Sequence, residues 1–411
     1  LFQIAMSRSL SVVNYGTLNS LLSLLIFISV PSATLKIFSA KNVSNNLALN
    51  NLPGAKKFIG RALKKTILYD GIFLVIFILC IPSLMKFMHI HFFSYYLIVG
   101  AAIFLTFPVS LILGALQGSR MYLSLGLYSG LMSVIKFSFA VLLVYMGFDL
   151  IGALFSIAIS PLVLLLISIV TLFIYFNSKS NKKERVDIKN IKTNIESFKT
   201  DKSYFFWIFL TLFFFTFFTN IDLIMVKHFF SGHEAGIYSV ADILGKIILY
   251  FPAAFVLVMF PEISHAHATN NKTKHILFKT ILITFIACSF LEIFYILFPQ
   301  DIISALMGNK YSDSGPLLSL YGLSMFPFAF INILINYFMA VNNSKIIIPM
   351  FIFSILEVSS FSLFHNSLKE IIMFIMITGW LILFTLMFYA FHDELIIFFR
   401  KFYLKLQWSK G

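Results

Sequence analysis

The sequence predicts an all-α, polytopic membrane protein, and three observations lead to this fold class. Of the 411 residues, 59% belong to the apolar set AVILMFWYC and 12% are Asp, Glu, Lys or Arg. Soluble proteins contain about 25% charged residues. Eleven apolar runs of about twenty or more residues alternate with short polar segments. Because a helix rises 1.5 Å per residue and the hydrocarbon core is about 30 Å thick, each run can span a membrane.

The eleven predicted spans cover most of the chain, and a water-soluble fold is excluded. Their approximate bounds are 17–40, 66–88, 92–116, 121–147, 150–176, 204–229, 235–260, 276–299, 315–341, 346–366 and 369–391.

Lysine and arginine are distributed unevenly over the connections between these spans. One alternate set of connections, which includes the C-terminal tail, carries 22 of the 31 basic residues. Because positively charged loops stay cytoplasmic, this set and the C-terminus are predicted to be cytoplasmic. The net charge of +14 is therefore explained by membrane topology and by attraction to anionic membrane lipids, which we expect as partners. It does not indicate a nucleic-acid partner. The opposite set carries five basic residues, Arg8, Lys86, Lys227, Lys310 and Lys369.

The longest hydrophilic stretch, 177–203, carries eight basic and four acidic residues and is predicted to be a basic cytoplasmic linker. It separates an N-terminal transmembrane bundle, 1–176, from a C-terminal one, 204–391, which a basic cytoplasmic tail follows at 392–411. With that tail inside, eleven spans leave Leu1 outside, so an even total needs one more helix. We expect two six-helix bundles around a central cavity, with the first helix largely missing from this chain.

An internal repeat relates the two predicted bundles. The motif Ser-x-x-x-x-Gly ends at Gly16 and again at Gly236, and the apolar helix after it contains Pro31 or Pro252. The tetrapeptide Lys-Thr-Ile-Leu also opens one helix in each half. Two halves of like orientation are the architecture of many secondary transporters, whose substrate site lies between the halves near the midplane.

Two stretches of the sequence carry a family resemblance. The first, MSRSLSVVNYGTLNSLLSLLIFISVP, resembles the opening of Wzx-like polysaccharide flippases of the multidrug/oligosaccharidyl-lipid/polysaccharide exporter superfamily. The second, TNIDLIMVKHFFSGHEAGIYSVADILGKIILYFPAAFVLVMFPEIS, is similar to the second-half signature of that family.

This resemblance implies a secondary transporter that is not an enzyme. Its substrate would be an undecaprenyl-diphosphate-linked oligosaccharide, moved from the inner to the outer leaflet of a bacterial cytoplasmic (inner) membrane by alternating access. The pathway would be surface polysaccharide biosynthesis, such as that of lipopolysaccharide O-antigen or capsule. A polysaccharide polymerase and a chain-length regulator are the further partners that the resemblance implies.

Basic side chains at bilayer depth are candidates for binding the diphosphate, because an ionisable group there costs at least about 2.5 to 3.5 kcal/mol. Lys136 and Lys246 lie near the middle of their spans. In a transporter of two bundles they would face a shared cavity from opposite halves. Alternatively, each lysine snorkels or pairs with a carboxylate. Arg8, in an external turn, matches the arginine of the family, which implies a contact with phosphate or headgroup.

Four acidic residues are candidates for coupling or gating. Asp242 precedes Lys246 by four residues, so the two can pair along one helix face. That pair is either structural or a gate, for which phosphate or a coupling proton competes. Asp222 matches the family signature. Glu292 and Glu357 lie at depth, and either take up protons in a coupled cycle or hydrogen-bond to a neighbouring helix.

Other polar residues have plainer interpretations. Lys36 and Asp70 lie about one turn from the cytoplasmic ends of their predicted helices, where snorkelling accounts for them. His265 and His267 lack a third ligand in sequence range, so no metal site is expected. No cofactor is expected either, and the coupling ion is H⁺ or Na⁺.

Two other functions compete with the flippase. A cation-coupled multidrug exporter of the same superfamily predicts an acidic cavity for a cationic drug, whereas the deepest charges here include two lysines. A membrane polysaccharide polymerase usually needs a sizeable external loop with catalytic side chains. The longest external connection, 300–314, offers only Asp301, Lys310 and Asp313.

Overall fold

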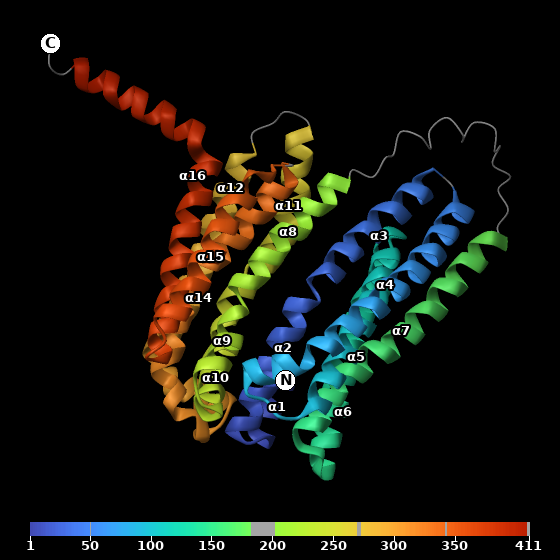
Figure 1. Ribbon diagram of the computed structural model, residues 1–411. Helices are drawn as coiled ribbons and strands as arrows, with labels where there is room; N and C mark the ends of the chain where they lie inside the picture. Colours follow the sequence, from blue (N-terminus) through green and yellow to red (C-terminus); the bar gives the residue numbers. More distant parts are fainter. Residues whose placement is uncertain (50, 182–201, 269–272, 342, 409–411) are drawn as a thin grey trace. The chain divides into compact units, whose positions relative to one another are not determined.

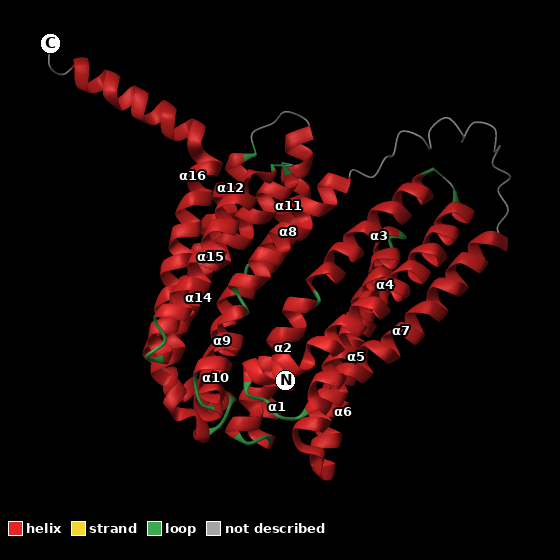
Figure 2. Cartoon of the chain, in the orientation of Figure 1, coloured by secondary structure: helices red, strands yellow, loops and turns green. Residues whose placement is uncertain are grey.

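The computed structural model describes the chain apart from residues 50, 182–201, 269–272, 342 and 409–411. Within this described part, the structure consists of helices and short connections, without strands (Figure 2). Most of the predicted linker, 177–203, lies outside the described residues. The helical architecture agrees with the all-α class expected from the apolar runs.

The described residues contain seven helical segments that are long and apolar enough to cross a membrane, or up to nine when each of two bent pairs is one span. One pair is α2 (Val12–Ile28) with α3 (Val30–Ala48), bent by 43°. The other is α8 (Lys202–Phe218) with α9 (Ile221–Phe229), bent by 41°. Prolines and missing backbone hydrogen bonds are the usual causes of such bends, and α3 begins with Pro31 at its first turn.

Two features explain why this number is smaller than the eleven predicted spans. Residues Tyr122–Ile174 count as one segment of 53 residues. This segment reverses at Gly147, where φ is +91°, so that α6 packs along α7. The predicted span 235–260 falls on α10 and α11, and α10 includes Glu234 and two further charged residues that lower its hydropathy.

The chain forms two compact units, and each is described by itself. Unit 1 comprises residues 1–239 with 306–308, and unit 2 comprises 240–305 with 309–411. The predicted bundles 1–176 and 204–391 stay predictions, because units defined by their packing need not coincide with sequence repeats.

The helices are α1 (Phe2–Ser9), α2, α3, α4 (Leu52–Met88), α5 (Phe93–Gly118), α6 (Tyr122–Leu143), η1 (Val144–Phe148), α7 (Asp149–Asn181), α8, α9, α10 (Gly232–Tyr250), α11 (Ala253–Ala268), α12 (Lys274–Leu297), α13 (Pro299–Leu306), η3 (Asn309–Ser314), α14 (Gly315–Ala340), η4 (Ser344–Ile346), α15 (Ile347–Leu363) and α16 (Leu368–Trp408).

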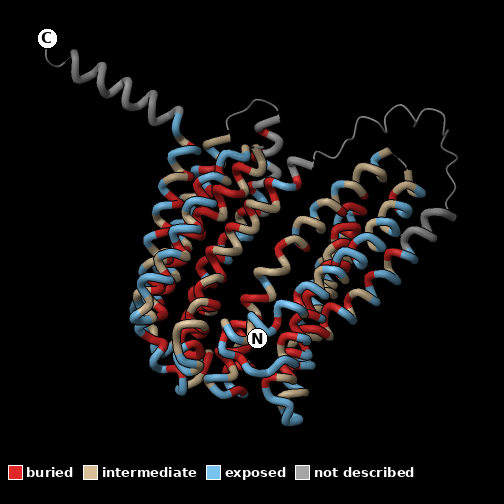
Figure 3. The backbone as a smooth tube through the Cα atoms, viewed as in Figure 1, coloured by how far each residue is buried: buried red, intermediate tan, exposed pale blue. Residues whose placement is uncertain are grey.

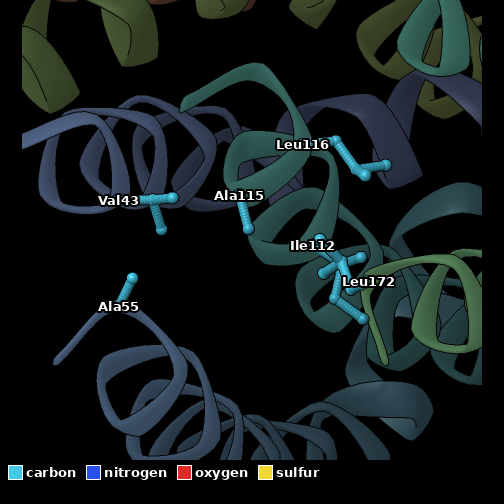
Figure 4. Packing of buried hydrophobic residues seen from close by; sticks show 6 residues of the cluster. All are labelled: Val43, Ala55, Ile112, Ala115, Leu116 and Leu172. Atoms are coloured by element: carbon cyan, nitrogen blue, oxygen red, sulfur yellow. The ribbon is translucent and has the colours of Figure 1, made fainter. Parts of the chain in front are cut away.

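Helix α5 is the centre of unit 1, and α3, α4 and α7 pack around it (Figure 1). Two glycines one turn apart bring the α3 backbone close. A Cβ atom added to Gly114 would lie 2.2 Å from the carbonyl oxygen of Lys36, and one added to Gly118 would lie 2.4 Å from that of Ala40. Small residues at this spacing allow membrane helices to approach closely. Figure 4 shows the adjacent apolar cluster of Val43, Ala55, Ile112, Ala115, Leu116 and Leu172.

The two glycines of the sequence repeat contact each other within unit 1. A Cβ atom added to Gly16 in α2 would lie 2.5 Å from the backbone nitrogen of Gly236 in α10. One added to Gly236 would lie 2.2 Å from the carbonyl oxygen of Val12. Side chains cannot occupy either space, so both positions of the repeat require glycine.

The serines of the same repeat start the two helices. The Ser11 hydroxyl accepts a hydrogen bond from the Asn14 backbone N–H at 3.2 Å. Ser231 and Glu234 form a reciprocal capping box, in which each side chain accepts a hydrogen bond from the other's backbone N–H, at 3.2 and 3.0 Å. The motif Ser-x-x-x-x-Gly therefore combines a helix cap with a close helix contact.

Helix α14 is the centre of unit 2, where it packs against α11, α12 and α16. Many residues of the helices around α14 are exposed, as the pale blue positions of Figure 3 show. Large apolar residues are among them. On α12, Phe278, Phe285 and Phe290 are 59%, 51% and 61% exposed. Apolar surface this extensive marks an interaction site in a soluble protein. On a helix long enough to cross a membrane, it is the face that lipid covers.

We predict that Gly236→Ala destabilises the protein, because its Cβ atom would force α2 and α10 apart. Overpacking of this kind costs about 1–3 kcal/mol, and thermal unfolding of the purified protein in detergent measures it. The matched control is Gly126→Ala in α6, where a Cβ atom meets nothing within 4 Å. An unfolding temperature of Gly236→Ala equal to that of the control would contradict the close contact.

Candidate functional site

The candidate residues are distributed over both units. Unit 1 holds Arg8, Lys136 and Asp222, and unit 2 holds Asp242, Lys246, Glu292 and Glu357. The predicted shared cavity between Lys136 and Lys246 stays a prediction, since these two lysines belong to different units.

Asp242 and Lys246 form a buried ion pair on α10. The Lys246 ammonium lies 2.5 Å from an Asp242 carboxylate oxygen, and the two residues are 7% and 3% exposed. The same oxygen accepts a hydrogen bond from the Tyr321 hydroxyl in α14, at 2.6 Å. A Cβ atom on Gly245 would lie 2.5 Å from the Tyr321 ring, so this glycine lets the ring approach. The predicted i, i+4 pair is thus present, and a tyrosine from a second helix supports it.

Glu292 on α12 is a second buried carboxylate of unit 2. It is 4% exposed, and neither carboxylate oxygen has a hydrogen-bond partner among the described residues. A Cβ atom on Gly322, the residue after Tyr321, would lie 2.3 Å from Glu292 Oε2. One turn further on, the Tyr295 hydroxyl donates a hydrogen bond to the Leu244 carbonyl at 2.7 Å. Helices α10, α12 and α14 therefore converge at these polar residues.

Asp222 lies in the first turn of α9, where a carboxylate interacts favourably with the positive end of the helix dipole. It is completely buried and accepts a hydrogen bond from the Tyr238 hydroxyl at 2.9 Å. Both residues come from the stretch that resembles the family signature, so the structure brings two parts of that signature together. Glu357, on α15, is also completely buried. The coupling or gating roles of both carboxylates stay predictions.

Lys136 and Arg8, the two predicted diphosphate contacts in unit 1, are less enclosed than Lys246. Lys136 on α6 is half-buried, and its ammonium lies 4.8 Å from the centroid of the Phe2 ring, a cation–π contact. Arg8 is exposed in the last turn of α1, the helix that also carries Phe2. Sequence reasoning missed Lys227, which is 6% exposed in the last turn of α9 rather than in a connection.

The structure corrects the interpretation of Asp70 as a snorkelling residue. Helix α4 begins at Leu52, so Asp70 lies 18 residues from either end, about 27 Å at the helical rise. Asp70 is 3% exposed, and neither carboxylate oxygen has a hydrogen-bond partner among the described residues. Hydropathy placed the start of this helix at residue 66, because the basic residues between Lys56 and Lys65 lie outside the apolar run. The helix itself includes these basic residues and begins at Leu52.

The part of the chain that the structure describes contains no group of three or more His, Cys, Asp or Glu side chains that could hold a metal ion.

Comparison with known sequences gives one family match. A family model described as polysaccharide biosynthesis protein matches residues 57–267, just over half of the chain. No curated protein matches the sequence.

Comparison with solved structures shows the fold. A multidrug resistance MATE family transporter of the MOP superfamily, in an inward-facing conformation, has a TM-score of 0.72 at 14% identity, over 95% of this chain and 93% of that chain. A MOP superfamily transporter from Pyrococcus furiosus has a TM-score of 0.66 at 15% identity, over 95% and 91%. These identities show similarity of fold alone. The fold class predicted from the sequence is confirmed.

We predict that Asp242→Asn strongly destabilises the protein, because it leaves Lys246 buried without its countercharge. Removal of one partner from a buried ion pair costs about 3–5 kcal/mol. The double variant Asp242→Asn with Lys246→Met removes both charges and is expected to recover most of the lost unfolding temperature in detergent. If the double variant is no more stable than Asp242→Asn alone, the two charges do not compensate each other.

Proposed function

The chain belongs to the polysaccharide biosynthesis protein family, and from this premise we propose that it is a flippase for undecaprenyl-diphosphate-linked oligosaccharides. The family and the MATE-type fold together identify a membrane transporter, and they confirm the resemblance to polysaccharide flippases of the MOP superfamily. The proposed cycle is alternating access across the bacterial inner membrane, with the C-terminus cytoplasmic. It would supply surface polysaccharide biosynthesis, such as that of O-antigen or capsule, without enzymatic activity of its own.

The buried pair of Lys246 and Asp242 is the observation that carries this proposal. A diphosphate can replace the Asp242 carboxylate as the anionic partner of Lys246. Asp242 then keeps the hydrogen bond from Tyr321, so the exchange leaves no buried carboxylate without a donor. A lysine is suited to this role, because its flexible stem can follow a moving phosphate. The pair would thus act as a gate that the substrate headgroup opens.

Lys136 and Arg8 are the proposed further contacts of the diphosphate. The ring of Phe2 holds the Lys136 ammonium by a cation–π contact, typically worth about 0.5–2 kcal/mol. A phosphate forms charge-assisted hydrogen bonds with an ammonium and can therefore displace the ring. Arg8 is exposed and can present a planar guanidinium to phosphate or to a lipid headgroup.

Coupling to H⁺ or Na⁺ is proposed for the buried carboxylates, and Glu292 is the best supported of them. Its two oxygens have no hydrogen-bond partner among the described residues. A buried carboxylate without a donor is costly, so a proton or a cation at Glu292 would relieve that cost.

A polysaccharide polymerase and a chain-length regulator are proposed as partners, since both act on the product of the flippase.

We predict that Lys246→Ala lowers the delivery of long surface polysaccharide per amount of membrane protein, beyond any loss of protein that removal of one partner from a buried ion pair causes. A host strain that lacks the gene and expresses each variant is assayed for surface polysaccharide per amount of membrane protein. The matched control, Lys279→Ala, removes an exposed lysine of α12 and is expected to behave like the wild type. Normal polysaccharide in the Lys246→Ala strain would remove Lys246 from the site.

Deletion of the gene separates the flippase from the alternative, a cation-coupled multidrug exporter. The flippase predicts that lipid-linked oligosaccharide accumulates in the inner leaflet, as a leaflet-specific labelling assay would show. An exporter instead predicts a normal distribution between the leaflets and increased sensitivity to cationic drugs. Restoration of the gene is the control for both results.

A further inference from the structure

Lys227 is a buried cation of unit 1 that the proposed flippase function does not use. It lies in the last turn of α9 and is 6% exposed. Its ammonium forms no hydrogen bond and no ion pair with the residues that the structure describes. The C-terminal end of α9 favours a positive charge, but it supplies no hydrogen bond to this one. Burial of a charge without a partner is costly, and an anion from outside the chain would compensate it.

The Lys227 ammonium lies at the beginning of α10. A Cβ atom added to Gly232, the first residue of that helix, would lie 3.5 Å from the ammonium nitrogen and 2.9 Å from Cγ1 of Val13. Val13 is the second residue of α2. The contact of Gly16 with Gly236 lies one turn further along each helix. Lys227 therefore approaches a point at which the first turns of two helices meet.

The beginnings of these two helices attract an anion. Each helix dipole is equivalent to about half a positive charge at its N-terminus, and the first N–H groups of a helix have no partner within it. The Ser11 hydroxyl accepts a hydrogen bond from the N–H of Asn14, and the Ser231 hydroxyl accepts one from that of Glu234. Both serines thus satisfy the third position of their helix. The N–H groups at the first two positions have no hydrogen-bond partner among the described residues.

Two carboxylates occur close to these turns, and both are engaged elsewhere. The Glu234 carboxylate accepts a hydrogen bond from the Ser231 N–H at 3.0 Å. The Asp149 carboxylate accepts one from the Asn14 amide at 2.6 Å. Both acidic residues are exposed, and neither is paired with Lys227. The chain itself therefore leaves the buried ammonium without a countercharge.

The kinds of donor at this point favour a phosphate group as the anion. Phosphate groups bind at helix N-termini, because the N–H groups there point at the ligand and the dipole favours negative charge. An ammonium adds strong charge-assisted hydrogen bonds. A phosphate group has several acceptor oxygens, so it can accept hydrogen bonds from the ammonium and from backbone N–H groups at once. A chloride ion offers a single atom for the same donors.

We propose that Lys227 and the N-terminal turns of α2 and α10 form a binding site for a phosphate group, which free phosphate or the headgroup of a membrane phospholipid supplies. The ammonium contributes the charge, and the first backbone N–H groups of the helices contribute hydrogen bonds. Lys246, Lys136 and Arg8, the residues assigned to the diphosphate, are not part of this site. The proposal therefore does not rest on the flippase function.

Binding of radiolabelled inorganic phosphate to the purified full-length protein in detergent tests the proposal by equilibrium dialysis. We expect saturable binding by the wild type and a loss of affinity of at least tenfold for Lys227→Met. This variant keeps an apolar stem of similar length and removes the buried charge. Phosphate should raise the unfolding temperature of the wild type and leave that of Lys227→Met unchanged, because a ligand stabilises only the state that binds it.

A second variant keeps the lysine and blocks the site. Gly232→Asp places a carboxylate beside the Lys227 ammonium, at a helix position where an acidic residue is favourable. It should lower the affinity for phosphate at least tenfold, and its unfolding temperature shows whether it is folded. The matched control is Lys86→Met, which removes an exposed lysine from the last turn of α4 in the same unit. This control should bind like the wild type.

Two competitors identify the ligand. Chloride at the same ionic strength should not displace the labelled phosphate. Dihexanoyl phosphatidylglycerol, used below its micellar concentration, should displace it. Tighter binding of this lipid than of inorganic phosphate assigns the site to a phospholipid headgroup, and tighter binding of inorganic phosphate assigns it to the free ion.

Four results would overturn the proposal. They are the absence of saturable binding by the wild type, equal affinity of the wild type and folded Lys227→Met, unchanged binding by folded Gly232→Asp, and equal competition by chloride. The last result would identify a site that selects charge alone. Because the assay contains no glycan lipid and no transport step, these results leave the flippase proposal untouched.

Discussion

The backbone contact between Gly16 and Gly236 is the constraint on which the surroundings of Asp222 in unit 1 depend. It fixes the first turns of α10 against α2, and the hydrogen bond from Tyr238 to Asp222 fixes the same turns against α9. Tyr238 follows Gly236 by two residues, so the donor of this hydrogen bond is placed by a contact in which no side chain can yield. Backbone-to-backbone packing of this kind tolerates no gradual adjustment, since interiors are close-packed.

The sequence predicted the positions of most helices because the membrane imposes a length and an apolar composition on each. It also predicted the ion pair of Asp242 and Lys246, which depends only on helical spacing. It could not reveal Tyr321 as the third member, since that residue comes from another helix. Asp70 was misjudged for a related reason: the hydropathy of α4 falls near its start, whereas its backbone hydrogen bonds continue through the charged residues. Tertiary partners and helix ends are the two things that periodicity does not encode.

Four of the buried carboxylates form two groups that differ in what they need. Asp242 and Asp222 accept hydrogen bonds from tyrosines, and Asp242 also pairs with Lys246, so the protein itself compensates their burial. Asp70 and Glu292 lack hydrogen-bond donors among the described residues. Compensated carboxylates fix neighbouring helices to one another. Uncompensated ones create a demand for a proton or a cation, which makes them the better candidates for binding and coupling.

The fold by itself does not decide the substrate, because one fold serves many functions and the site residues carry the chemistry. The solved transporters share this fold at 14–15% identity, which leaves almost every site residue free to differ. In this chain a half-buried lysine, Lys136, lies in unit 1, and a lysine paired with a carboxylate, Lys246, lies in unit 2. The surroundings of each charged side chain therefore have to be assessed one by one, because the fold alone assigns no charge to a site.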